Sequence, residues 1–211
     1  MKRYLVEAVG TFFLTMAVSL SLMANPIAIG LMLMAMIYMG GYISGGHFNP
    51  AVTTAVWLCN GFSLTVSMGY KVAQVLGALA AGALFYGMTE TLFVMPAEGP
   101  LAWGVVHEAL LGFVFCAVAL TVMERYKVAG VGGLVIGLTL VAIAFLGGVV
   151  NPALGICSMV SCLLKGEFVS ALDNVLVHVA GPMLGAIVAA YWYKYLNTPE
   201  IHGAHTQQRV S

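Results

Sequence analysis

The tripeptide Asn-Pro-Ala occurs twice, as Asn49-Pro50-Ala51 and as Asn151-Pro152-Ala153. Proline is favoured at the first position of a helix, where its missing N–H costs nothing, and asparagine is a good residue just before it. The asparagine oxygen can accept from a free N–H of the helix, and its amide group is left as an outward donor. Each tripeptide therefore predicts a helix start that carries a donor and about half a positive charge.

Glycine-rich backbone comes before each tripeptide, at 44–48 and 147–150, and a short apolar run follows it, Ala51–Cys59 or Ala153–Leu164. Neither run reaches the about 20 residues that cross a bilayer. Such interrupted segments at matching places of two halves indicate re-entrant half-helices around a site. The preceding backbone would line a wet passage, and the expected lining residues are Gly45, Gly46, His47, Val149 and Val150.

Two half-helix ends that face each other in mid-membrane would act on a passing solute in two ways. Their donors oblige a water or a hydroxyl to accept a hydrogen bond, and their partial positive charges repel cations. A single Asn-Pro would equally well begin an ordinary buried helix. Two copies in matching positions favour a shared pore, which needs no bound cofactor.

The composition indicates a membrane protein. Of the 211 residues, 61% are apolar and 8% are charged, whereas soluble domains carry about 25% charged residues. Six segments are expected to span the bilayer, at 4–23, 27–43, 63–87, 101–123, 129–146 and 168–196. All lysines and arginines except Lys165 then fall on one side, which predicts a cell-membrane protein with both termini in the cytoplasm.

Other functions find little support in the residues. The net charge is zero and there is no basic stripe, which excludes a nucleic-acid partner. The four cysteines lie in apolar segments without metal-ligand spacing, so they are expected to be buried apolar side chains. The sequence shows no nucleophile–base pair and no metal cluster, and it therefore predicts neither an enzyme nor a metal site.

The chain contains an internal repeat. Ile29–Ala35 and Ile136–Ala142 agree at five of seven positions. Three other pairs of landmarks agree within a few residues of the same offset: the two Asn-Pro-Ala tripeptides, Glu7-Ala8 with Glu108-Ala109, and Gly77-Ala78 with Gly185-Ala186. Three spans per repeat is an odd number, so the second half must be inverted. We expect a first repeat at 1–98, a second at 99–196 and a polar tail at 197–211.

Glu7 and Glu108 are carboxylates inside expected spans, at matching positions of the two repeats. Placing an ionisable carboxylate inside a membrane costs free energy, so such a residue is taken first as a candidate for function. A proton relay would need a chain of titratable partners, which the sequence does not offer. A structural role is favoured, in which each carboxylate accepts hydrogen bonds from the backbone of a re-entrant loop.

The segment Ser44–Thr53, Ser-Gly-Gly-His-Phe-Asn-Pro-Ala-Val-Thr, closely resembles the first signature of the aquaporin and glycerol-facilitator family. Further similarity lies at 7–12, 70–78 and 181–186, and the resemblance covers residues 3–196. It implies an all-α membrane fold with six transmembrane helices and two re-entrant half-helices, and a homotetramer with one pore in each subunit. The implied function is passive permeation of water and small neutral solutes.

The sequence departs from the family after the second tripeptide, where Leu154 replaces an arginine. Arginine would supply fixed donors and a positive charge against cations and protons. Matching to the family pattern places the rest of the outer constriction at Ile29, Ala144 and Gly148. We expect this apolar set to form a wider mouth that admits glycerol, urea, ammonia or hydrogen peroxide. The alternative is that another group replaces the arginine, or that a bulky neighbour closes the mouth, such as Phe145 or Met159.

Two rival functions fit the same elements. An alternating-access transporter also uses inverted repeats and broken helices, but it needs a coupling-ion site near the midplane, where the sequence offers apolar residues and two loop-bracing glutamates. A non-conducting structural membrane protein would result if Leu154 and Ile29 occlude the pore. Flux that saturates and follows an ion gradient would favour the transporter, and zero water permeability would favour the structural protein.

Overall fold

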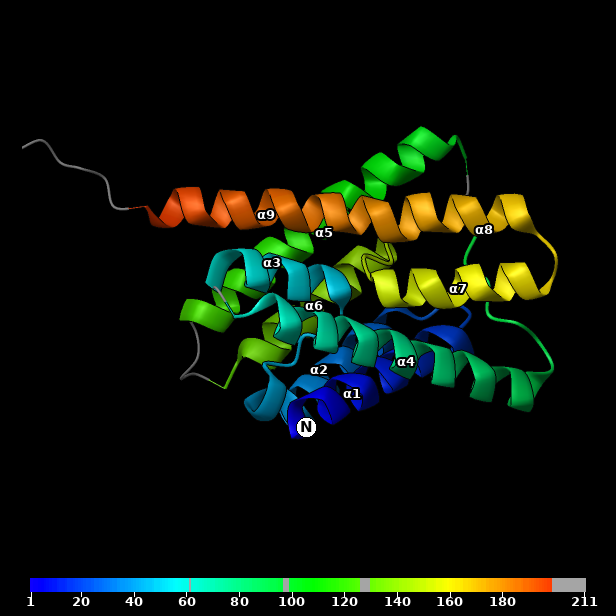
Figure 1. Cartoon of the computed structure of the whole chain (residues 1–211), viewed down its shortest axis with the longest axis horizontal. Coiled ribbons are helices and arrows are strands. Elements are labelled where there is room, and N and C mark those ends of the chain that lie inside the picture. The colour runs from blue at the N-terminus through cyan, green and yellow to red at the C-terminus, as the bar shows by residue number, and fades with distance from the viewer. Residues whose placement is uncertain (61, 97–98, 126–129, 199–211) are drawn as a thin grey trace, which may run out of the picture.

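The computed structural model describes residues 1–60, 62–96, 99–125 and 130–198. Within these residues all the regular structure is helical, as the all-α prediction requires (Figure 1). The elements in chain order are α1 Lys2–Leu20, α2 Pro26–Ser44, α3 Pro50–Asn60, α4 Leu64–Thr89, α5 Leu101–Arg125, α6 Gly132–Phe145, α7 Pro152–Leu164, α8 Phe168–Val175, the π-helical turn η1 Leu176–Ala180, and α9 Gly181–Asn197. Most of the expected polar tail lies outside the described residues.

Five helical stretches of the described chain are long and apolar enough to cross a membrane, namely α1, α2, α4, α5 and the continuous run Phe168–Asn197. The fifth expected span, 129–146, is represented by α6, which has 14 residues. At 1.5 Å per residue α6 covers about 21 Å, less than the roughly 30 Å hydrocarbon thickness. The helix begins only after Gly130 and Val131, where the backbone of Gly130 has φ +63°.

The two short helices α3 and α7 begin at Pro50 and Pro152. Figure 1 shows them running away from the middle of the molecule in opposite directions, between the longer helices. Their N-terminal ends therefore point toward each other. Because this is the arrangement expected of two re-entrant half-helices, the fold agrees with the inverted repeat that the sequence predicts.

Asparagine caps both half-helices as expected. The side-chain oxygen of Asn49 accepts from the N–H of Ala51 at 2.8 Å, and that of Asn151 accepts from the N–H of Ala153 at 3.1 Å. A third Asn-Pro pair starts α2, where Asn25 accepts from the Ala28 N–H at 3.0 Å. Since α2 is a long spanning helix, Asn-Pro by itself marks only a helix start.

In each half, two long helices meet at a small residue, and the two contacts lie at matching positions of the repeat. A side chain at Gly77 of α4 would clash with the carbonyl oxygen of Ala8 in α1, and one at Gly185 of α9 would clash with the carbonyl oxygen of Ala109 in α5. These contacts join α1 to α4 in the first half and α5 to α9 in the second. Glycine lets the two backbones of each pair approach closely, and Glu7 and Glu108 directly precede the contacted alanines.

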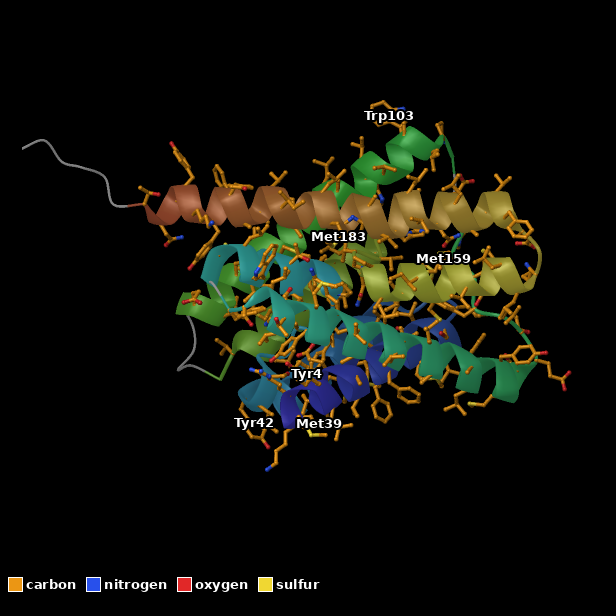
Figure 2. The ribbon with its side chains drawn as sticks, viewed as in Figure 1. Tyr4, Met39, Tyr42, Trp103, Met159 and Met183 are labelled. Carbon is orange, nitrogen blue, oxygen red and sulfur yellow. The ribbon has the colours of Figure 1, made fainter. Side chains whose placement is uncertain are left out.

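Large apolar side chains cover the outside of the bundle. Figure 2 shows Trp103 projecting away from α5, and this residue is 69% exposed. Other exposed apolar residues on the long helices include Leu76, Leu110, Leu184 and Val188. A surface of this kind matches a lipid environment.

We predict that Gly77→Ala lowers the melting temperature of the protein in detergent, because the added methyl group meets the Ala8 carbonyl and overpacking costs about 1–3 kcal/mol. The matched control is Gly87→Ala in the same helix, where nothing lies within 4 Å of the added atom. Gly87→Ala should leave the melting temperature unchanged or raise it. Equal losses in the two variants would contradict the close α1–α4 contact.

Candidate functional site

Glu7 of α1 holds the loop that precedes α3. Its Oε1 accepts from the Ser44 hydroxyl at 2.6 Å and from the His47 N–H at 3.0 Å. Its Oε2 accepts from the Phe48 N–H at 2.6 Å and from the Gln74 amide at 2.7 Å. The carboxylate is fully buried, so these four donors replace the water that it cannot reach.

Glu108 of α5 does the same for the loop that precedes α7. Its Oε1 accepts from the Val149 N–H and its Oε2 from the Val150 N–H, each at 2.8 Å. The imidazole of His178, for which the sequence suggested no role, lies 3.3 Å from Oε1. The geometry in both halves is that of a loop-bracing carboxylate.

The two asparagines bind the opposite loop. The Asn49 amide donates to the Val150 carbonyl at 2.8 Å, and the Asn151 amide donates to the Phe48 carbonyl at 3.0 Å. Each amide group has two N–H donors, so one remains available to a solute. The Val150 carbonyl, expected among the acceptors along the passage, is occupied by Asn49, and the Val150 residue is fully buried.

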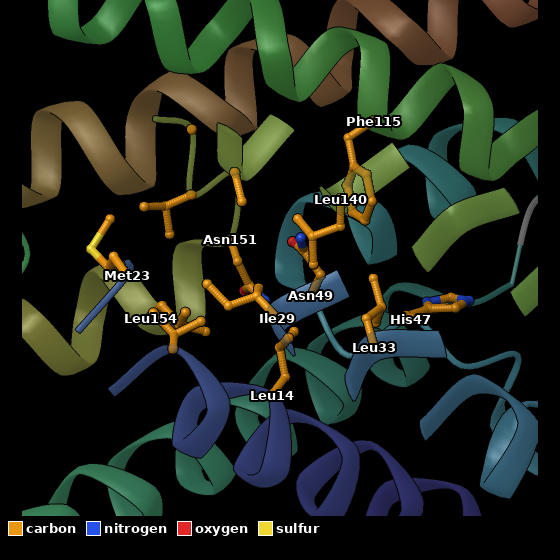
Figure 3. Close-up of a pocket in the computed structure, with 14 residues that line it drawn as sticks. Leu14, Met23, Ile29, Leu33, His47, Asn49, Phe115, Leu140, Asn151 and Leu154 are labelled. Atoms are coloured by element: carbon orange, nitrogen blue, oxygen red, sulfur yellow. The ribbon is translucent and has the colours of Figure 1, made fainter. Parts of the chain in front are cut away.

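A cavity of about 30 Å³ lies where the two half-helices meet (Figure 3). This is enough for one or two water molecules. Both asparagines line it, and so do the four residues expected at the outer constriction: Ile29, Ala144, Gly148 and Leu154. Leu154 is only 2% exposed and Ile29 only 5%, so the outer end is closely packed in this conformation.

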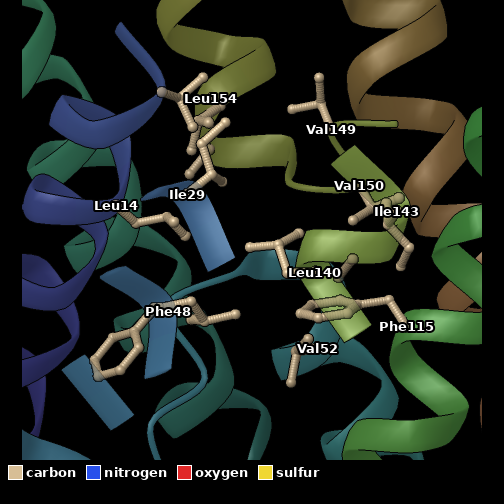
Figure 4. Packing of buried hydrophobic residues seen from close by; sticks show 14 of the residues in the cluster. Leu14, Ile29, Phe48, Val52, Phe115, Leu140, Ile143, Val149, Val150 and Leu154 are labelled. Atoms are coloured by element: carbon tan, nitrogen blue, oxygen red, sulfur yellow. The ribbon is translucent and has the colours of Figure 1, made fainter. Parts of the chain in front are cut away.

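The wall of this cavity is otherwise apolar. Leu14, Ile29, Leu140, Phe115 and Leu154 also belong to the buried hydrophobic cluster of the molecule (Figure 4). The side chains with hydrogen-bonding groups are Asn49, Asn151 and His47, and no charged side chain is among the lining residues of the described chain. A solute in the cavity can therefore find side-chain hydrogen bonds at its centre and inner end only.

Several lining residues were not expected from the sequence: Leu14, Val18, Met23, Leu33, Phe115 and Leu140. Met23 is the bulky neighbour at the outer end, whereas Phe145 is 65% exposed and neither Phe145 nor Met159 lines the cavity. Leu22 and Met23 follow α1 with φ +48° and +61°. Such left-handed backbone is unusual for leucine and methionine, and nothing in the sequence predicts it.

A second cavity of about 540 Å³ is lined by Gly45, His47, Tyr38, Tyr42 and residues at the start of α6. We call it the inner cavity, because it lies at the end of the molecule that the sequence predicts to face the cytoplasm. His47 lines both cavities, so its side chain forms the neck between them. Gly46 and Val150 line neither, while Val149 lines the central cavity. The expected lining backbone is thus divided between the two cavities.

The His47 ring is oriented by a chain of hydrogen bonds. Its Nδ1 lies 3.1 Å from the Thr53 hydroxyl, which accepts from the Gln74 amide at 2.9 Å. That hydroxyl also has a proton of its own, which it can donate to Nδ1. The arrangement favours the tautomer with the proton on Nε2, which would provide a donor at the neck.

The described residues hold no group of three or more His, Cys, Asp or Glu side chains that could bind a metal ion. Cys116, Cys157 and Cys162 are buried and Cys59 is partly buried, and all four are free thiols.

Comparison with known proteins gives a consistent result. The family described as "Major intrinsic protein" matches residues 1–193. "Glycerol uptake facilitator protein-like 6" of Lactiplantibacillus plantarum is 34% identical over 95% of this chain and 100% of its own length, and "Nodulin-26" of Glycine max is 33% identical over 94% and 80%. The X-ray structure of the aquaglyceroporin from Plasmodium falciparum superposes with a TM-score of 0.78 at 22% identity, over 91% of this chain and 94% of that one.

We predict that Glu7→Ala destabilises the protein more than Glu7→Gln. Alanine leaves four buried donors unpaired, each worth about 1–3 kcal/mol, whereas glutamine keeps one acceptor oxygen at the loop. The melting temperature in detergent is the measurement, and the same order should hold at Glu108. Equal destabilisation by the two substitutions would show that the carboxylate does not brace the loop.

Proposed function

We propose the function of this chain on the basis of its family: it belongs to the major intrinsic protein family. Members of this family are membrane channels for water and small solutes and not enzymes, and the chain is accordingly a multi-pass membrane channel. We infer that it conducts water and small uncharged solutes passively, along a path from the inner cavity past His47 to the central cavity and out past Leu154.

The meeting of Asn49 and Asn151 carries this proposal. Each asparagine caps its own half-helix with its oxygen and binds the opposite loop with one N–H. The remaining N–H groups and the two helix ends present donors and partial positive charge to the same small cavity. A water or hydroxyl oxygen is oriented as an acceptor there, and a cation is repelled.

The selectivity proposed here follows from the apolar wall. A charged solute would lose its hydration in a cavity whose lining, in the part of the chain that the structure describes, offers three polar side chains and no charge to replace it. Leu154 supplies neither the donors nor the charge of an arginine. Uncharged solutes are therefore favoured over ions by the lining as a whole.

The size of the solute is a separate matter. With Leu154 and Ile29 packed as they are, the central cavity admits a water-sized molecule. Glycerol or urea would pass when Leu154, Ile29 and the flexible Met23 side chain move apart. The wider mouth expected from the sequence stays a prediction, and the likeness to the relative named "Glycerol uptake facilitator protein-like 6" supports it.

The close packing of Leu154 and Ile29 favours a second candidate, a structural protein of the same fold whose pore is occluded.

A homotetramer in a cell membrane, with both termini in the cytoplasm, completes the proposal. The position of the basic residues supports this orientation: Lys2 and Arg3 begin α1, whereas Lys165 follows the end of α7, where it pairs with Glu167 at 2.7 Å.

We predict that liposomes containing the purified protein shrink faster than empty liposomes in an osmotic step, and that they also take up glycerol or urea without any ion current. Ala144→Trp, which fills the central cavity, should abolish both fluxes. Leu110→Trp on the exposed face of α5 is the control and should leave them unchanged. Water flux equal to that of empty liposomes would favour the occluded structural protein, and water flux without glycerol or urea flux would eliminate the wider mouth.

We further predict that Leu154→Arg lowers permeability to glycerol and urea more than permeability to water, because the guanidinium narrows the outer end of the cavity. Water flux should remain measurable. The control is Leu164→Arg at the exposed end of the same helix. If Leu154→Arg lowered all fluxes in proportion, Leu154 would not discriminate between solutes.

A further inference from the structure

The two bracing carboxylates differ in their side-chain partners. Glu7 accepts from two backbone N–H groups, one hydroxyl and one amide, all of them neutral donors. Glu108 accepts from two backbone N–H groups, and among the described residues its side-chain neighbour within hydrogen-bonding distance is His178. An imidazole thus contacts the carboxylate of the second half, where an amide and a hydroxyl donate in the first, although the pairing of Gly77 with Gly185 makes Tyr70, and not Gln74, the sequence counterpart of His178.

The His178 ring lies between two acceptors. Its Nδ1 is 3.3 Å from Glu108 Oε1, and its Nε2 is 3.3 Å from the carbonyl oxygen of Pro96. A neutral imidazole has a single N–H. With an ionised Glu108, one ring nitrogen of a neutral His178 would turn its lone pair toward an oxygen lone pair, and the buried site would keep an unbalanced negative charge.

One additional proton removes both the contact between two lone pairs and the unbalanced negative charge. An imidazolium donates to Glu108 and to Pro96 at once; alternatively, a protonated Glu108 donates to Nδ1 while Nε2–H donates to Pro96. In either form the pair is neutral, which avoids a charge held by only two backbone N–H groups at a site where Glu108 is 1% and His178 4% exposed. The proton belongs to the pair and not to one residue.

The position of His178 connects this pair to the conduction path. His178 lies on the π-helical turn η1, and its backbone carbonyl packs against Gly155, the residue after Leu154. Pro96 belongs to the connection between α4 and α5, which is itself fixed by a bond of 2.7 Å from the Met95 N–H to the Ser158 hydroxyl of α7. His178 therefore joins α5, this connection and the start of α7.

We propose that His178 is a positioning residue for the outer half of the path, and that one proton shared with Glu108 keeps the backbone of Val149 and Val150 in its conducting position. The proposal rests on the proposed function, because flux is one of its readouts. Of the three residues that the described chain places against His178 by hydrogen bonding or close packing, Glu108 is titratable, whereas Gly155 of α7 and the Pro96 carbonyl do not titrate. Without the shared proton, the buried charge of Glu108 keeps only its two backbone donors and the loop is held less firmly.

The test compares wild type with His178→Gln and His178→Phe in liposomes, with water flux measured from about pH 5 to about pH 9. Glutamine can donate to Glu108 as Gln74 does to Glu7, and it does not titrate. We expect wild-type flux to fall several-fold on the alkaline side, His178→Gln to keep near wild-type flux at neutral pH without that fall, and His178→Phe to lose flux at every pH.

The other four histidines, His47, His107, His202 and His205, are present in wild type and in His178→Gln, so the difference between the two profiles isolates His178. Glu98 stands two residues after Pro96 in the sequence, and Glu98→Gln is the control for loss of a carboxylate close to Pro96 along the chain. NMR of a sample labelled in the histidine rings and in the glutamate carboxyl groups gives a readout independent of flux. The histidine signal absent from His178→Gln should show either two ring N–H groups beside an ionised Glu108, or one ring N–H beside a protonated Glu108.

Identical pH profiles in wild type and His178→Gln would overturn this inference, and so would a neutral His178 beside an ionised Glu108. If the wild type conducts nothing at any pH, the proposed function fails, and the NMR measurement still decides whether the proton is shared. Wild-type flux with a failed NMR prediction removes the inference and leaves the proposed function standing.

Discussion

Non-helical backbone at membrane depth must find hydrogen-bond partners inside the protein, and the rest of this structure depends on how that is achieved. Glu7 and Glu108 supply the acceptors, each for two consecutive backbone N–H groups of a loop. A carboxylate is suited to this task because its two oxygens accept several bonds without donating any. The cost of burying its charge is offset by the number and strength of those bonds.

With the loops held, the two half-helices can be joined through their caps. Each asparagine fixes its own helix start and the opposite loop, so the two halves are linked reciprocally at the centre of the molecule. This link also sets the chemistry of the cavity, because the same amide groups are its donors. The stability of the protein at its centre and the orientation of a solute thus depend on the same two side chains, Asn49 and Asn151.

The apolar wall around that centre limits what can pass. Leu154 and Ile29 close the outer end, while His47 divides the central cavity from the inner one. Polar contacts are concentrated at the asparagines and the neck, and ions find no compensation for lost hydration. Among the described residues no cationic side chain lines the outer end of the cavity, so its width depends on how the side chains of Leu154, Ile29 and Met23 pack.

What the sequence determined by itself is local or periodic. Pro50 and Pro152 begin helices because the capping asparagine is the adjacent residue, and the repeat of Glu7 at Glu108 predicted two braced loops because both precede matching motifs. The tertiary structure alone decided the partners: Val150 is engaged by Asn49, 101 residues away, and His178 meets Glu108 from 70 residues away. Met23 reaches the cavity through an unusual turn, and α6 is shorter than its apolar segment. These features depend on how helices that are distant in sequence pack against each other, and the spacing of residues along the chain does not predict that packing.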